Sequence, residues 1–288
     1  MIRNSASAGV FKTTPLQSFL FTSTTITVKK TIGLLLAVFS SCFAYSQGKI
    51  GNFYVTWGYH RDSYTRSTIH FKDNKTDDYN FTLHKANAHD KPDLHDFFHT
   101  APTVPQYVLN FGYFFAKKSQ WGIEVSWDHL KYVVTDNQVM HLTGEIRGQH
   151  FDQDTLVTPK FVHFEHTNGN NYLMVSVIRR FKWLTSARHP ETGLSIITKG
   201  GMGGLVPKTD SYIMGNHNDG PFRLSGFVIG ASANLRYDFY RYLFAEVGIK
   251  GAFADYTDAK LYLEGRARHS FFSAQYIAAL GINVPLSK

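Results

Sequence analysis

The chain has 288 residues, of which 43% are apolar and 18% are charged, with 30 Lys and Arg against 22 Asp and Glu. This length and apolar content allow one large domain or two small ones, whereas the slightly negative mean hydropathy excludes a helical polytopic membrane protein. The single cysteine excludes a disulfide framework and a Cys-rich zinc domain. The 24 Phe and 16 Tyr residues argue against a disordered chain.

Residues 1–46 have the composition of an export leader. They contain no acidic residue, and a Lys pair is followed by the apolar segment 31–45, which ends in small residues before Gln47. This order predicts a secretory signal peptide that is cleaved after Ser46. Residues 1–27 precede the Lys pair and are interpreted as a mis-called translation start; a short buried helix or a membrane anchor is the alternative for the apolar segment. The basic residues of the leader are Arg3, Lys12, Lys29 and Lys30.

Cys42 leaves a second form of processing open, because the sequence Phe39-Ser40-Ser41-Cys42 loosely resembles a lipobox. A lipobox normally has an aliphatic residue at the position of Phe39, so cleavage after Ser46 is favoured over lipidation of Cys42. The mature chain, residues 47–288, then contains no cysteine, which suits passage through an oxidising periplasm. Loss of the four basic leader residues also lowers the formal charge from +8 to +4.

The rest of the chain alternates apolar residues with small or polar ones and shows no long helical period. A period of two places successive side chains on opposite faces of a strand. Each alternating segment has one apolar face, and several are about as long as a membrane-crossing strand. Eight strands are predicted, at about 53–59, 107–115, 121–127, 173–183, 194–202, 227–237, 243–253 and 272–284.

Short and long connections between these strands alternate. The short ones lie at about 116–120, 185–192 and 238–241, and the long ones at about 61–103, 135–170, 207–222 and 256–270. Such alternation in an even number of antiparallel strands is typical of outer-membrane barrels. The sequence therefore predicts an all-β fold, an eight-stranded antiparallel transmembrane β-barrel with short periplasmic turns, long extracellular loops and both termini in the periplasm.

The polar faces of the predicted strands distinguish this barrel from a soluble sandwich or a lipocalin-like barrel. A soluble barrel places its apolar rows inside and its charges outside. Here the polar faces carry charges of both signs among Gly and Ser, and the apolar rows begin or end with Trp or Tyr, as an aromatic girdle requires. A narrow lumen can hold such charges as a paired filling. The predicted lumen ion-pair network consists of Glu124, Lys199, Arg236, Glu246 and Lys250.

Several short stretches carry a resemblance to known proteins, among them Trp57-Gly58-Tyr59-His60-Arg61 and Ala88-His89-Asp90-Lys91-Pro92. With Asp128-His129-Leu130-Lys131-Tyr132-Val133, they make the chain resemble the small bacterial outer-membrane barrels of the OmpA and OmpW type, and most of all a group of such barrels that has no activity to carry over. The resemblance covers most of residues 47–288 and implies an architecture, but fold does not give function. It implies contact with outer-membrane lipid and lipopolysaccharide, the barrel-assembly machinery as a partner during biogenesis, and a monomer by default.

The 14 histidines are distributed unevenly, because only His189 lies in a predicted short turn. Imidazole and carboxylate groups together bind first-row metals. A divalent metal site is therefore a candidate in the first long connection, although no pair there has a tight ligand spacing, and no other cofactor is expected. The alternative is that long polar loops tolerate histidine and use it to tie loop backbones together. The candidate metal ligands are His89, Asp90, His95, Asp96 and His99.

Asp128 and His129 lie where the third predicted strand changes its apolar face, which predicts a β-bulge at the rim of the barrel. An Asp-His pair can also act as a general base, so Asp128, His129 and His269 are candidate catalytic residues of a lipid hydrolase. The His-x-Ser-Asn motif of PagL-like lipid A deacylases is absent. The Gly-rich segment 200–204 lacks the Lys-Ser or Lys-Thr of a phosphate loop, and the dispersed basic residues exclude nucleic acid as a partner.

Three functions remain open. The favoured hypothesis is an integral outer-membrane protein with a structural role or with a binding or adhesive role exerted through its long loops. The alternatives are a lipid A deacylase-like hydrolase and a narrow channel or conduit for small apolar ligands. Eight strands argue against a wide pore, because side chains fill so narrow a barrel.

Overall fold

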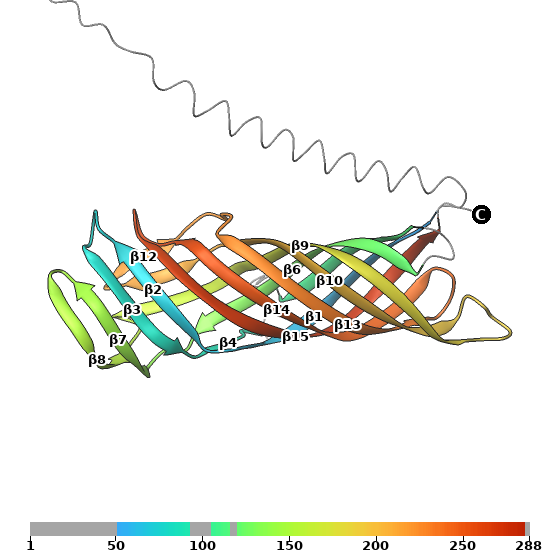
Figure 1. Cartoon of the computed structure of the whole chain (residues 1–288), viewed down its shortest axis with the longest axis horizontal. Coiled ribbons are helices and arrows are strands. Elements are labelled where there is room, and N and C mark those ends of the chain that lie inside the picture. The colour runs from blue at the N-terminus through green and yellow to red at the C-terminus, as the bar shows by residue number, and fades with distance from the viewer. Residues whose placement is uncertain (1–50, 93–104, 116–119, 286–288) are drawn as a thin grey trace, which may run out of the picture. The chain divides into compact units, whose positions relative to one another are not determined.

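The computed structural model describes residues 51–92, 105–115 and 120–285, and its regular structure in these ranges consists of β-strands (Figure 1). Within these ranges no helix is long and apolar enough to cross a membrane. Eight antiparallel strands form a ring that closes when the last of them pairs with the first. The eight-stranded prediction is confirmed. The ring strands, in order, are β1 (Asn52–Tyr64), β5 (Tyr107–Phe114), β6 (Trp121–Val134), β9 (Val162–Thr185), β10 (Gly193–Pro207), β13 (Gly226–Asp238), β14 (Leu243–Lys260) and β15 (Arg266–Pro285).

The register of the ring sets its width. Following paired residues once around the ring from Tyr54 leads back to β1 at Tyr64, ten residues further on. In a barrel of eight strands, this stagger goes with a strand tilt of about 35–45° and an interior that side chains can fill. The lumen is therefore a packed interior.

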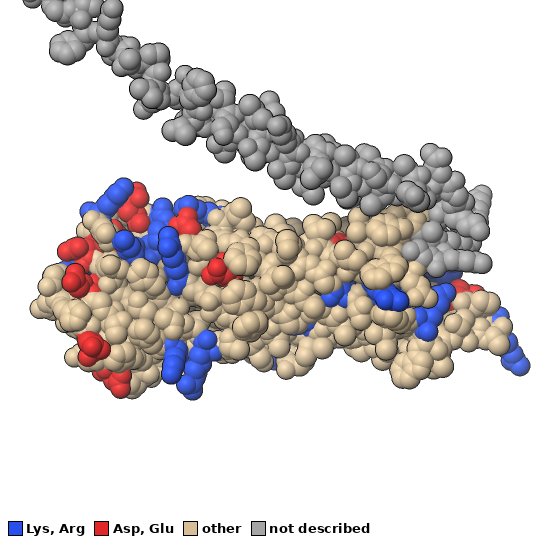
Figure 2. Space-filling view, viewed as in Figure 1, with Lys and Arg blue, Asp and Glu red and all other residues tan. Residues whose placement is uncertain are grey.

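The outer surface of the ring carries an apolar belt. On β14, Val247 and Ile249 point outward and are about half exposed, whereas Glu246 and Lys250 point inward and are buried. Figure 2 shows one face of this belt, where the middle section carries few charged side chains. So large an exposed apolar surface is unfavourable in water and matches the lipid-facing band of a membrane barrel. The belt includes Trp57, Trp121, Val125, Trp127, Leu173, Val175, Val177, Met202, Ile229, Val247, Ile249, Phe272, Leu280 and Ile282.

Beyond one end of the belt, the strands continue into a region that we name the β extension. It contains the far ends of β6, β9, β14 and β15 and seven further strands. The sheet continues from β15 through β2, β3 and β7 to β8, while the remaining short strands attach to β9 and β6. These strands are β2 (Ser67–Asp73), β3 (Tyr79–Ala86), β4 (Ala88–His89), β7 (Gln138–Ile146), β8 (Gln149–Val157), β11 (Asp210–Ile213) and β12 (Asn216–Asp219).

The β extension corrects the prediction of four long loops. The described parts of 61–103, 135–170, 207–222 and 256–270 are mostly strand. Short alternating runs within these polar segments, such as Ile69 and Phe71 on β2 or Phe81 and Leu83 on β3, bury their apolar side chains completely. These residues join side chains from β7, β9, β14 and β15 in one hydrophobic core. The β extension is thus solid, with its apolar residues inside.

The bulge predicted on β6 at Asp128 and His129 is absent, and the irregularity lies instead on the neighbouring strand β9. The register between β6 and β9 shifts between Leu130 and Tyr132, where three residues of β9 (167–169) lie opposite one residue of β6. Gly169 has a φ of 145° there, a conformation that a side chain would strain. Leu130 and Tyr132, on either side of this shift, both pack into the core of the β extension. The irregularity therefore marks the change from a polar lumen to an apolar interior.

Candidate functional site in the barrel interior

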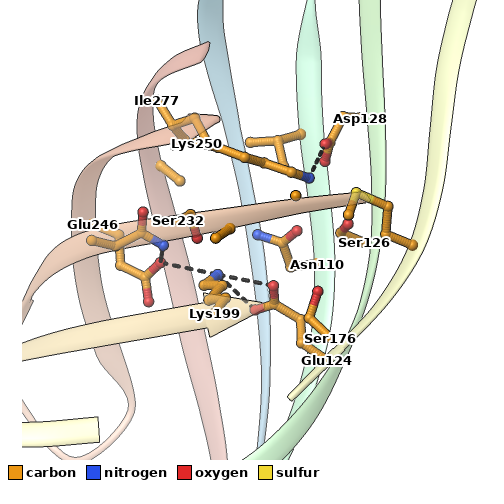
Figure 3. Close-up of a pocket in the computed structure, with 16 residues that line it drawn as sticks. Asn110, Glu124, Ser126, Asp128, Ser176, Lys199, Ser232, Glu246, Lys250 and Ile277 are labelled. Carbon is orange, nitrogen blue, oxygen red and sulfur yellow. Dashed lines mark hydrogen bonds and ion pairs between the residues drawn. The ribbon is translucent and has the colours of Figure 1, made fainter. Parts of the chain in front are cut away.

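An ion-pair network crosses the lumen at the level of the apolar belt. Lys199 of β10 points between Glu124 of β6 and Glu246 of β14 (Figure 3). The Lys199 Nζ atom lies 2.7 Å from the Glu124 Oε2 atom and 3.8 Å from the Glu246 Oε2 atom. Arg236 adds a second cation, since its Nη1 atom lies 3.6 Å from Glu246 Oε1 and its Nε atom 3.1 Å from Asp238. The network thus links four strands across the interior.

Aromatic rings close the lumen beside this network. The Tyr54 hydroxyl donates a hydrogen bond to Glu124, while the Arg236 guanidinium lies 3.2 Å from the centroid of the Phe244 ring. Tyr54 can cross the lumen because Gly112 faces it: a Cβ atom at Gly112 would lie 2.1 Å from the ring. These groups fill the barrel at the short-turn end, where β9 meets β10 and β13 meets β14.

A second ion pair lies nearer the β extension. The Lys250 ammonium of β14 donates to the Asp128 carboxylate of β6 (Figure 3). Between the two pairs lies a cavity of about 20 Å³, lined among others by Asn110 and Ser126. Such a volume holds about one water molecule. Four of the five predicted lumen residues therefore share one network, and the fifth, Lys250, pairs instead with Asp128.

A buried histidine and a buried carboxylate form a third polar layer, which was not predicted from the sequence. The Nδ1 atom of His60 lies 2.9 Å from the Oδ1 atom of Asp62, and the Gln106 amide donates to the other carboxylate oxygen at 2.6 Å. His60 and Asp62 are two apart on β1, so they share the inward face. The spacing of two could have predicted this pair from the sequence, although the outward residues Tyr59 and Arg61 between and before them give no sign of it. The layer is a buried polar filling in which both carboxylate oxygens of Asp62 have a partner.

A pair of histidines lies at the centre of the β extension. The Nε2 atoms of His166 and His269 are 3.2 Å apart, and Thr209 lies 3.1 Å from the Nδ1 atom of His166. Tyr256 stacks on both imidazoles, with ring centroids 4.9 and 4.6 Å away. Because this site lies beyond the apolar belt and excludes water, burial lowers the pKa of His166 to about 3. Burial, and then the nearby His166, lower the pKa of His269 well below its usual value. Both imidazoles are therefore neutral at pH 7.

The three candidate catalytic residues are held by different partners. Asp128 pairs with Lys250, the Nδ1 atom of His129 lies 2.9 Å from the Asn171 side-chain oxygen, and His269 contacts His166. His129 also stacks on the Tyr107 ring. The structure therefore does not bring Asp128, His129 and His269 together as one catalytic group.

The candidate metal ligands are only partly described. Asp90 accepts a hydrogen bond from the Nε atom of Arg61 at 2.7 Å, while the Nδ1 atom of His89 lies 3.0 Å from the Thr135 hydroxyl. His95, Asp96 and His99 lie outside the described residues, so the metal site stays a prediction. Among residues 51–92, 105–115 and 120–285, no three His, Cys, Asp or Glu side chains are grouped to hold a metal ion.

Comparison with solved structures finds similar architectures at low sequence identity. The attachment invasion locus protein Ail of Yersinia pestis is 10% identical, with a TM-score of 0.35 over 82% of this chain and 99% of Ail. OprG of Pseudomonas aeruginosa is 12% identical, with a TM-score of 0.38 over 82% of this chain and 97% of OprG. The protease OmpT of Escherichia coli is 9% identical, with a TM-score of 0.34 over 81% and 96% of the two chains.

These similar structures differ in their roles: Ail is an attachment invasion locus protein, OprG an outer-membrane protein and OmpT an outer-membrane protease. No protein-family model matches the sequence. No curated protein matches it either. Because every TM-score above is below 0.5, the geometry of this chain must support any assignment of function. That geometry is an outer-membrane type of β-barrel with a filled lumen.

Proposed function

We propose that the protein is a closed outer-membrane β-barrel that presents the β extension outside the cell as a rigid binding surface. The observation that carries this proposal is the hydrophobic core of the β extension, in which Ile69, Phe71, Leu83 and Phe164 are fully buried. Flexible loops need no such core. A core beyond the membrane holds a surface in one shape, as recognition by preorganised surfaces requires.

The edge of the extended sheet supports a binding role. β8 is the outermost strand of the path and has no second neighbour among the described strands. Val139 and its partner Leu156 on β7 and β8 are more than half exposed, so an apolar spot lies beside a free edge. Asp152 and Asp154 on β8 place charges along that edge, a device that limits unspecific strand pairing. The edge therefore suits a selective partner.

The filling of the lumen favours a closed barrel rather than a channel. Lys199, Glu124, Glu246 and Arg236 cross it at the level of the belt, and the core of the β extension fills it above. We expect the purified protein to give no single-channel conductance in planar bilayers. Steady conductance steps from the wild type would favour the channel hypothesis instead.

Orientation is the part of this proposal that labelling on intact cells tests most directly. A Leu156→Cys variant, with the thiol on β8, should react with a membrane-impermeant maleimide on intact cells. The matched Arg188→Cys variant, at the exposed short-turn end, should react only after the outer membrane is permeabilised. The reverse pattern would overturn the proposed orientation. Removing the hairpin 138–157 should then leave a folded barrel and reduce attachment of the cells to protein- or polysaccharide-coated surfaces.

A further inference from the structure

A basic patch lies on the outward face of the β extension, just beyond the apolar belt. Arg268 of β15 is on the same face as Phe272, four residues closer to the long-connection end, and Arg266 is two residues further. On the neighbouring strand β2, His70 pairs in register with Arg268, and Lys72 with Arg266. The patch consists of Arg223, Lys260, Arg266, Arg268, His70 and Lys72.

Part of this patch forms a pocket of about 320 Å³. His70, Lys72, Lys75, Arg266 and Arg268 line it, together with two acidic residues. One of these, Asp73, is engaged by the β2–β3 turn, because its carboxylate accepts hydrogen bonds from the Lys75 and Thr76 amides at 2.9 and 3.0 Å. The pocket is therefore positive overall. It also lies open to solvent, since Lys72 and Arg268 are exposed.

The remaining basic side chains are held close together beside the pocket. Asp258 pairs with Arg223 and, at 2.9 Å, with the Nε atom of Arg266, so one carboxylate holds two guanidinium groups in place. Partial burial and the charges of Arg266 and Arg223 lower the pKa of Lys260. Crowded cations of this kind gain most from an anion that carries several charges.

Directly below the patch, the belt contains an open groove of about 960 Å³. Its floor is a row of small residues that are paired in register across three strands: Gly200, Ala231 and Gly251. A Cβ atom at Gly200 or Gly251 would meet no atom within 4 Å. Met202, Ile229, Phe253 and Phe272 form one wall, so the groove has the apolar lining that an acyl chain requires.

We propose that the basic patch and this groove together bind lipopolysaccharide, with its phosphate groups on the patch and an acyl chain in the groove. The inference rests on the orientation proposed above, which places the patch at the outer leaflet. Along β15, Arg268 is about 13 Å and Arg266 about 20 Å from Phe272, at roughly 3.3 Å per residue. The positive charges are therefore spread along the strand, as suits a lipid that carries several phosphate groups and continues outward as an anionic saccharide.

Binding of purified lipids to the purified full-length protein in detergent tests this site independently of orientation. The headgroup variant is Arg268→Gln with Lys72→Gln, since these two residues form no ion pair within the described part of the chain. The groove variant is Gly251→Leu. Matched controls are Lys182→Gln with Arg188→Gln at the short-turn end, and Ala278→Leu on the outward face of β15 outside the groove.

Lipid A should bind to the wild type and to both controls with equal affinity. The headgroup variant should bind it about tenfold or more weakly, the change expected when a charged hydrogen bond is lost, and should bind dephosphorylated lipid A no differently from the wild type. The groove variant should also bind lipid A more weakly. Equal binding by all variants, or equally tight binding of phosphatidylglycerol by the wild type, would overturn the proposal. Failure of the maleimide experiment alone would overturn the orientation and leave these in vitro affinities unchanged.

Discussion

The two halves of the barrel interior are built in opposite ways. At the level of the belt, the inward side chains are Glu124, Lys199 and Glu246, and the outward ones are apolar. In the β extension, the inward side chains are Phe164 and Phe271 and the outward ones are polar. On β15 a single strand makes both kinds of surface without changing which parity faces inward: Phe271 is buried in the β extension, and Gln275 and Asn283 are buried in the barrel. The medium around each half, lipid or water, therefore determines whether the inward face of a strand carries polar or apolar residues.

The difference shows which forces stabilise each half. In the membrane, apolar side chains gain no free energy by moving from lipid into the barrel interior. The interior can therefore hold polar groups that pair with one another. Beyond the membrane, water surrounds the strands, and burial of apolar surface supplies the stability as in a soluble protein. The bulge that contains Gly169 lies at the boundary between the membrane half and the β extension.

The largest expected effect comes from breaking the lumen network. Lys199→Met leaves Glu124 and Glu246 buried without their shared cation and should lower the free energy of unfolding by about 3–5 kcal/mol. Urea unfolding in lipid vesicles measures this change. The double variant Lys199→Met with Glu124→Gln should recover most of the loss, because one buried charge is removed with its partner. Lys182→Met, which is exposed at the short-turn end, is the control. A double variant no more stable than the single one would show that pairing is not what stabilises the lumen.

The next effect is on the outer face of β14. Val247→Arg places a charge in the middle of the belt and should destabilise the folded barrel by about 2–4 kcal/mol in lipid. Asp255→Arg lies on the same outward face of the same strand, beyond the belt, and should change stability little. The comparison uses the same unfolding assay for both variants. If both cost the same, the boundary of the belt has been placed wrongly.

A third effect is a dependence on pH that the buried histidine pair should give to the β extension. Since the pKa of His166 is about 3 when folded and about 6.5 when unfolded, the unfolded chain binds more protons between these values. Stability is therefore full above about pH 6.5 and falls on acidification, by about 1.4 kcal/mol per pH unit for each histidine. Hydrogen exchange at pH 7 and pH 5 should show faster exchange of amides in the β extension at pH 5, after correction for the intrinsic rate, and unchanged protection in the belt.

His269→Phe provides the test of cause for this pH dependence. The variant keeps an aromatic ring beside Tyr256 and removes one titrating group, so the effect of acid should become smaller. His150→Phe on exposed β8 is the control and should leave the effect unchanged. An equal response to acid in the wild type and in His269→Phe would exclude the histidine pair as the cause.

The sequence predicted one half of this molecule better than the other. In the membrane half, the period of two is long and its outward rows are mostly apolar, so strand positions and the inward placement of Glu124, Lys199 and Glu246 could be inferred. In the β extension, strands such as β2 and β3 are short and rich in polar and charged residues. Their sequences therefore predicted loops instead of strands. Periodicity also carries no information about which strands meet. His166 and His269 are 103 positions apart, and only the register of the ring brings them together.

β15 completes both the ring and the extended part of the same sheet. Along most of its length it pairs with β1, and at its beginning it pairs with β2, so the ring and the extended sheet share this strand. Because it comes last in chain order among the strands, neither part is complete until it is in place. Pairings this distant in sequence slow folding and leave open edges that other strands can enter. The assembly of this chain is therefore expected to have one late, rate-limiting step, during which the partly formed sheet depends on protection from outside the chain.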